Sequence, residues 1–160
     1  IRNINDLKLK EFDKSVNNVL LNLAKRVVSD GEGASKFIQI DVLKCKSEED
    51  AKKISLSIAN SPLVKTAIAG GDPNWGRIMM AVGKSDVELN INSISLIIGN
   101  YKVFEKGQLA KNYSEQNLKD YMKSNSIKIT LEMNLGKKNF TCYTMDFTKK
   151  YIEINSDYRT

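Results

Sequence analysis

Residues 127–135, IKITLEMNL, alternate apolar and polar side chains without interruption. Successive side chains of a β-strand point to opposite faces of its sheet, so this pattern predicts a strand with one face in the core. A turn at residues 136–139 follows, and residues 140–147 are expected to return as another strand. Residues 38–42 alternate in the same way and predict a strand earlier in the chain.

Further strands are expected on both sides of the central segment. Residues 88–98 and 101–105 flank Gly99-Asn100, a pair that is typical of a two-residue hairpin turn. Two shorter apolar runs, residues 63–69 and 151–154, are also predicted to be strands.

Helical spacing occurs in four other segments. A long amphipathic helix is predicted around residues 12–27, where apolar residues recur three and four positions apart. Shorter helices are expected after Ser47, after Asn74 and over residues 113–123. These elements together predict an α+β fold, a mixed β-sheet with helices packed on one face.

The chain is expected to divide near residue 35. Residues 1–35 hold the amphipathic helix and a glycine loop, which we expect to pack against another part of the protein. Residues 36–160 form the α+β domain. With 160 residues, of which 41% are hydrophobic, the chain can bury a core without a disulfide or a metal.

Composition excludes several classes of function. The chain has no histidine, so it cannot supply a Ser-His-Asp or Cys-His pair or a histidine metal site. Cys45 and Cys142 lie far apart in sequence and suit reduced thiols in the cytoplasm, which is the expected location. The net charge is +6, but the lysines are scattered among acidic residues, which disfavours a nucleic-acid surface. No apolar run approaches the ~20 residues of a membrane span, so no membrane partner is expected.

One stretch rich in glycine and acidic residues could bind a ligand. Glu32 lies between Gly31 and Gly33, which let a ligand approach the backbone closely. A carboxylate in this setting suits an ammonium group better than a phosphate. A helix end followed by a turn explains the same residues without any ligand.

Two other polar stretches have a structural and a functional interpretation. Residues 70–77 are typical of a rigid corner between two elements, with one tryptophan packed and one arginine bridging to a neighbour. The C-terminal stretch, residues 154–160, is polar and so expected to be frayed. Asn155 and Thr160 in it could nevertheless offer amide and hydroxyl partners to a small polar ligand.

Four blocks of the sequence resemble the ornithine acetyltransferase family, the bifunctional glutamate N-acetyltransferases of arginine biosynthesis. They are VSDGEGASKFI at 28–38, IANSPLVKTA at 58–67, GDPNWGRI at 71–78 and INSDYRT at 154–160. The blocks follow the family's order and extend to the end of the chain, so the resemblance implies the family's self-cleaving fold.

The resemblance also implies a reaction. Members of the family are made as a precursor that cuts itself before a threonine, giving an α chain and a β chain. That threonine, with its own amine as base, takes acetyl from N2-acetylornithine and passes it to glutamate. No residue of this chain matches the threonine nucleophile, so the chain resembles the C-terminal part of a β chain, without a catalytic residue and inactive alone. An α chain and a second α/β copy, forming a heterotetramer, are the implied partners; no cofactor or metal is implied, although acetyl-CoA can serve as donor in bifunctional members.

Matched motif by motif, the resemblance assigns roles to residues of this chain. Glu32, Asn155 and Thr160 correspond to residues that bind ornithine or glutamate. The signature block carries Asp72, Asn74, Trp75 and Arg77, which we interpret as architectural. The segment before Asp146, Tyr143-Thr144-Met145, departs from the family's usual Trp-Gly-Cys.

Three other functions compete with acetyl transfer as interpretations of the sequence. The exposed apolar stripe of residues 12–27 also fits a non-catalytic assembly or binding module that needs an α-chain partner. A basic nucleic-acid binder would show steep salt dependence. Amide hydrolysis, as in related self-cleaving aminopeptidases, is disfavoured because those enzymes lack the block at 72–77.

Overall fold

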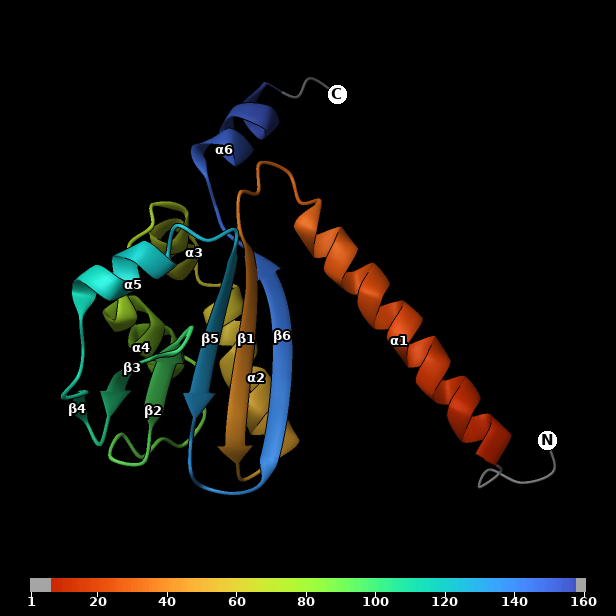
Figure 1. Cartoon of the computed structure of the whole chain (residues 1–160), viewed down its shortest axis with the longest axis horizontal. Helices are drawn as coiled ribbons and strands as arrows, with labels where there is room; N and C mark the ends of the chain where they lie inside the picture. Colours follow the sequence, from red (N-terminus) through yellow and green to blue (C-terminus); the bar gives the residue numbers. More distant parts are fainter. Residues whose placement is uncertain (1–6, 158–160) are drawn as a thin grey trace.

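The computed structural model describes residues 7–157, which form a mixed six-stranded sheet with helices on one face (Figure 1). The strands are β1 (Phe37–Cys45), β2 (Ser95–Ile98), β3 (Tyr101–Glu105), β4 (Gln108–Leu109), β5 (Ser126–Glu132) and β6 (Lys138–Met145). They lie in the order β4-β3-β2-β5-β1-β6. β1 and β5 are parallel, and the other neighbours are antiparallel. The predicted fold class, a mixed sheet with helices packed on it, is confirmed.

The helices are α1 (Leu7–Ser29), α2 (Glu48–Ala59), α3 (Pro62–Ala69), α4 (Trp75–Gly83), α5 (Glu115–Tyr121) and α6 (Lys149–Ser156). In Figure 1, α2, α3 and α4 cover the far face of the sheet, and within residues 7–157 the near face is left open except where the end of α1 meets β6. The core lies between this helical layer and the sheet, with Ile38, Ile40, Ile129 and Leu131 almost fully buried against Ile54 and Ile58.

β5 and β6 follow each other in the sequence but are separated in the sheet by β1. β5 and β6 both pair with β1, so residues 140–147 return antiparallel to β5 but not beside it. The turn between them crosses the end of β1, where Leu135 and Gly136 each donate an N–H to the Lys44 carbonyl at 2.8 Å. A side chain at Gly136 would collide with the Cys45 carbonyl, which is why this crossing needs glycine.

Two predicted strands are helices instead. Residues 63–69 belong to α3, because Ser61 accepts the Val64 N–H as its N-cap and Pro62 occupies the first turn. Residues 151–154 belong to α6, which Thr148 caps by accepting the Lys150 N–H. Short apolar runs suit a helix and a strand equally well, so in both places the cap decides.

The predicted strand at 88–98 is also shorter in the structure. Only Ser95–Ile98 forms β2. The residues before it turn at Asn90, whose side chain accepts the Asn92 N–H at 3.1 Å and whose carbonyl accepts the Ser93 hydroxyl at 2.8 Å. Such local side-chain bonds compete with a strand ladder.

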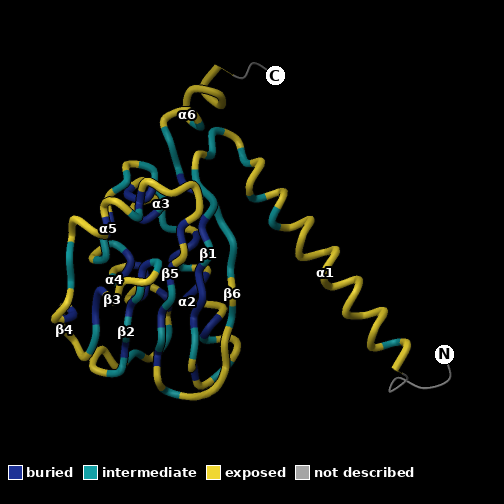
Figure 2. The backbone as a smooth tube through the Cα atoms, in the orientation of Figure 1, coloured by how far each residue is buried: buried dark blue, intermediate teal, exposed yellow. Residues whose placement is uncertain are grey.

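α1 extends away from the sheet, and none of its residues is buried (Figures 1 and 2). Its polar side meets β6, where the Lys25 ammonium lies 4.9 Å from the centre of the Tyr143 ring. The apolar side faces away, with Phe12 61% and Val27 74% exposed. The helix therefore presents its apolar stripe to solvent rather than to the sheet.

Candidate functional site

Glu32 and Asn155 meet although 123 positions separate them in the sequence. Glu32 follows the end of α1, and Asn155 lies in the last turn of α6. The Asn155 Nδ2 group donates to Glu32 Oε2 at 2.9 Å and to the Tyr151 carbonyl at 2.9 Å. Both side chains are exposed at the surface. Thr160, the third residue expected here, lies outside the described residues.

This pair offers hydrogen-bond acceptors rather than donors. Both Nδ2 hydrogens of Asn155 already have acceptors, which leaves its Oδ1 atom for a ligand. Glu32 adds an ionised carboxylate, which is acceptor-only. A ligand that approaches both residues must therefore bring hydrogen-bond donors, as an ammonium group does.

Two other segments of the chain approach the glycines beside Glu32 closely. A Cβ atom at Gly31 would overlap the Met145 side chain, and one at Gly33 would lie 2.6 Å from the Tyr151 backbone nitrogen. Gly33 also has φ +68°, a conformation that L side chains rarely adopt. The loop continues the end of α1, since Asp30 donates its N–H to the Arg26 carbonyl at 3.0 Å. The helix end followed by a turn is thus the local structure that carries Glu32.

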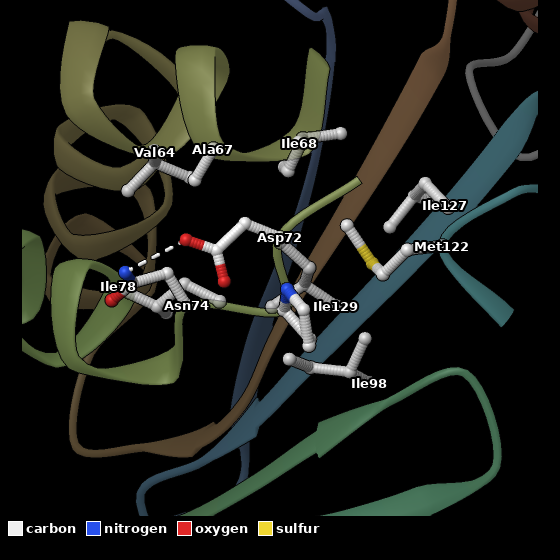
Figure 3. A pocket seen from close by; sticks show the side chains of 11 residues that line it. Val64, Ala67, Ile68, Asp72, Asn74, Ile78, Ile98, Met122, Ile127 and Ile129 are labelled. Atoms are coloured by element: carbon white, nitrogen blue, oxygen red, sulfur yellow. Dashed lines mark hydrogen bonds between the residues drawn. The ribbon is translucent and has the colours of Figure 1, made fainter. Parts of the chain in front are cut away.

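The signature block forms a corner over the core (Figure 3). The Asn74 Nδ2 group donates to Asp72 Oδ2 at 3.0 Å, and Asn74 Oδ1 accepts the Arg77 N–H at 3.2 Å, which caps α4. Arg77 Nη1 donates to the Leu63 carbonyl at 2.9 Å. The Trp75 ring stacks on Phe104 with centroids 5.8 Å apart. The Asn74–Asp72 bond lies within the corner, and each of the other contacts joins the corner to α3, α4 or β3.

The corner and the Glu32–Asn155 pair are separate places. Within residues 7–157, no hydrogen bond or ion pair joins Asp72, Asn74 or Arg77 to Glu32 or Asn155. The contacts of the corner are those of a support for α3 and α4. Nothing in its geometry brings a reactive group to the pair.

Residues 3–160 match the ArgJ family over almost the entire chain. The chain belongs to the ArgJ family. Among the curated relatives, the "Arginine biosynthesis bifunctional protein ArgJ" of Ruegeria pomeroyi is 48% identical over 150 residues, which cover 94% of this chain and 37% of the relative. The protein of the same name from Brucella melitensis is 44% identical over 155 residues, covering 97% of this chain and 38% of the relative.

A solved ArgJ structure has the same fold. The crystal structure of the arginine biosynthesis bifunctional protein argJ from Bacillus halodurans superimposes with a TM-score of 0.91 at 32% sequence identity. The match covers 96% of this chain and 72% of that chain. This chain thus spans well under half the length of the curated ArgJ relatives that it matches, and the recognised resemblance is confirmed at the level of the family.

The described part of this ArgJ chain contains neither a membrane-spanning helix nor a cluster of metal-binding side chains. Within residues 7–157, no helix is both long and apolar enough to cross a membrane. In the same part of the chain, no group of three or more cysteine or acidic side chains is arranged to hold a metal ion.

Lys36 and Asp146 anchor the site of this ArgJ chain, although the sequence motifs do not assign a role to either residue. The Lys36 ammonium donates to the Ile68 carbonyl at 2.9 Å and to the Met122 carbonyl at 2.7 Å, at the C-terminal ends of α3 and α5. Asp146, directly after β6, accepts the N–H groups of Ser35 and Lys36, directly before β1. The sequence marks Asp146 only as an acidic residue directly after β6, which itself carries no acidic residue. This position does not indicate which residues Asp146 binds.

Proposed function

We propose that this chain is the substrate-binding C-terminal part of a glutamate N-acetyltransferase, which moves acetyl from N2-acetylornithine to glutamate. Membership of the ArgJ family and the arginine-biosynthesis names of its relatives support this assignment. The observation that carries it is the 2.9 Å hydrogen bond from Asn155 to Glu32, because the bond joins two residues of separate family motifs in one acceptor-rich site.

The proposed division of labour follows from what this chain contains. The threonine nucleophile, with its own amine as base, belongs to the part of the relatives that this chain does not span. Glu32 and Asn155 bind the cationic amino group of the ornithine substrate and orient it, and Thr160 closes the site. Binding that holds the acyl group near the nucleophile lowers the entropic barrier to transfer. The transfer needs no cofactor, and acetyl-CoA is an additional donor only if the enzyme is a bifunctional member of the family.

The partner is proposed from the exposed face of α1. None of the residues of α1 is buried, and its apolar stripe points away from its own sheet. We infer that this face binds the remaining part of the relatives, an α chain, and that two such α/β units form the heterotetramer, which acts in the cytoplasm. A non-catalytic assembly module is the alternative, since it would use the same face of α1.

Replacing Glu32 tests the proposed function. The assay uses the complete enzyme, by which we mean this chain assembled with the part of an ArgJ relative that it does not span. Glu32→Gln keeps the shape but removes the charge that binds an ammonium group. The loss of a charge-assisted hydrogen bond is worth about 1.5–3 kcal/mol, so the KM for N2-acetylornithine should rise roughly tenfold to a hundredfold.

A matched control separates this effect from a general loss of acidic charge. Glu153 lies on the same helix as Asn155 and is exposed, so Glu153→Gln makes the same change without touching the pair. We expect that variant to keep the wild-type KM. If Glu32→Gln retains wild-type kinetics for acetyl transfer, the substrate-binding role is wrong.

A further inference from the structure

The carboxylate of Asp146 is buried where β6 passes into α6, and it holds the segment that follows Glu32. Asp146 is 1% exposed. Its Oδ1 atom accepts the N–H groups of Ser35 at 2.8 Å and of Lys36 at 3.0 Å, and Oδ2 accepts the Ser35 hydroxyl. Burying a carboxylate is unfavourable unless donors surround it, so these bonds hold both partners in place.

Further contacts tie the same two segments together. The Thr148 hydroxyl donates to the Gly33 carbonyl at 2.6 Å, and the Asp146 N–H donates to the Lys36 carbonyl at 3.1 Å. Gly33 lies so close to the first turn of α6 that a Cβ atom would meet the Tyr151 backbone. Figure 1 shows the connection from α1 to β1 beside the one from β6 to α6. Residues 31–36, which we call the glutamate loop, therefore interlock with residues 146–151.

The loop needs this anchor because its tip has little support of its own. Glu32 is exposed, and glycine on either side gives the backbone wide freedom when nothing restrains it. Asn155 binds the Glu32 carboxylate, but both side chains are at the surface, where such a bond is weak. The buried hydrogen bonds of Asp146 hold Ser35 and Lys36, three and four residues after Glu32, and so fix the end of the loop.

We propose that Asp146 is a positioning residue of the substrate site: by holding Ser35 and Lys36 it sets where Glu32 meets Asn155. This inference rests on the proposed binding role of Glu32. Lys36 also connects the loop to the helices, since its ammonium donates to backbone carbonyls at the ends of α3 and α5. Asp146 thus acts through the geometry of the pair and does not touch the substrate.

The test measures kinetics of Asp146 variants in the complete enzyme. Asp146→Ala should raise the KM for N2-acetylornithine about tenfold and leave kcat within about twofold, because it weakens binding of substrate and transition state alike. Asp146→Asn keeps an oxygen for the two N–H groups and can donate to the Ser35 hydroxyl, so it should restore the KM to within about threefold of wild type.

Coupling to Glu32 distinguishes positioning from a merely structural role. If Asp146 acts through Glu32, the double variant Glu32→Gln/Asp146→Ala should have the same KM as Glu32→Gln within about twofold. A tenfold further rise would overturn the inference. An unchanged KM in Glu32→Gln itself would overturn the proposed function and this inference with it, whereas a raised KM there with no effect of Asp146→Ala would overturn the inference alone.

Asp41→Ala is the matched control for the loss of a buried carboxylate. Asp41 is 7% exposed and accepts from Gln39, Thr141 and Lys128 on the open face of the sheet, away from the glutamate loop. It should lower the melting temperature and leave the KM unchanged; an equal rise of KM in both variants would contradict a specific role for Asp146. If Asp146→Ala does not fold, Ser35→Ala removes one of its three donors at a partly exposed position and should raise the KM about threefold.

Discussion

Glycine is needed at position 33 for two separate reasons, the backbone conformation and the space available. The φ of Gly33, +68°, suits glycine, and its missing side chain makes room for the backbone of Tyr151. Gly71 shares the first reason, with φ +70°, but a Cβ atom there would meet nothing within 4 Å. A comparison of substitutions at the two glycines therefore distinguishes two contributions to the loss of stability: the strained backbone conformation, which both share, and the collision with Tyr151, which only Gly33 has.

Alanine at these positions is expected to give different losses of stability. Gly71→Ala should lower the free energy of unfolding by about 1 kcal/mol, the cost of placing a side chain on a left-handed backbone. Gly33→Ala should cost about 3 kcal/mol, because the start of α6 must also move. Urea unfolding of both variants measures the difference. Equal losses would show that the approach of Tyr151 imposes no constraint.

Among the elements, the alternating strands and the helices that follow a clear capping residue could be predicted from the sequence, whereas two short apolar runs could not. The strands at 38–42 and 101–105 and the helix from Trp75 are present, and the strand predicted at 127–135 is present as Ser126–Glu132. The runs at 63–69 and 151–154 are too short for periodicity to decide. Ser61-Pro62 follows the end of α2 and also begins α3, because proline is well tolerated in the first turn.

The open face of the sheet carries a charged residue whose state affects stability. Burial by itself would raise the pKa of Asp41, but hydrogen bonds from Gln39, Thr141 and Lys128, together with the charge of Lys128, outweigh it and lower the pKa. The folded state therefore binds a proton at this carboxyl less readily than the unfolded state does. Its stabilising contribution is complete above the ordinary pKa of 3.8 and is lost as the pH falls through the lowered value.

Asp41→Asn should flatten the acid side of the stability profile. Asparagine can still accept from Thr141 and Gln39, so the fold should persist. The free energy of unfolding, measured in urea at pH 6 and at pH 3, should fall less on acidification in the variant than in the wild type. Asp13→Asn, at an exposed carboxyl on α1, controls for general charge effects. An identical acid dependence in wild type and Asp41→Asn would contradict the role of Asp41.

On the scale of the whole molecule, two segments that are far apart in the sequence are brought together beside the edge strand β6. Glu32 lies just after α1 and Asn155 lies on α6, and the family resemblance of their motifs is what singles out both residues in the sequence. Spacing alone could not have placed them side by side, since their meeting depends on β6 running antiparallel to β1. The role of Asp146 could not be predicted for the same reason: two of its three donors are backbone N–H groups of a distant loop, which leave no mark in the sequence.

The apolar side of α1 gives the last prediction, because the described residues leave it uncovered. Leu20 and Leu23 are 57% and 51% exposed on this side, while Asn18 and Asn22 lie on the opposite one. An apolar stripe of this length in water favours association. The chain alone should therefore self-associate in light scattering, and it should form a stable complex with the part of an ArgJ relative that it does not span.

Charge on the stripe should abolish both kinds of association without unfolding the sheet. Leu20→Glu/Leu23→Glu should remain monomeric and fail to co-purify with the partner segment, since an apolar interface cannot bury two unpaired carboxylates. Asn18→Glu/Asn22→Glu adds the same charge on the polar side and should behave as wild type. Circular dichroism checks that α1 persists in both variants. A wild-type chain that is monomeric alone and a leucine variant that still assembles would together show that this face of α1 binds no partner.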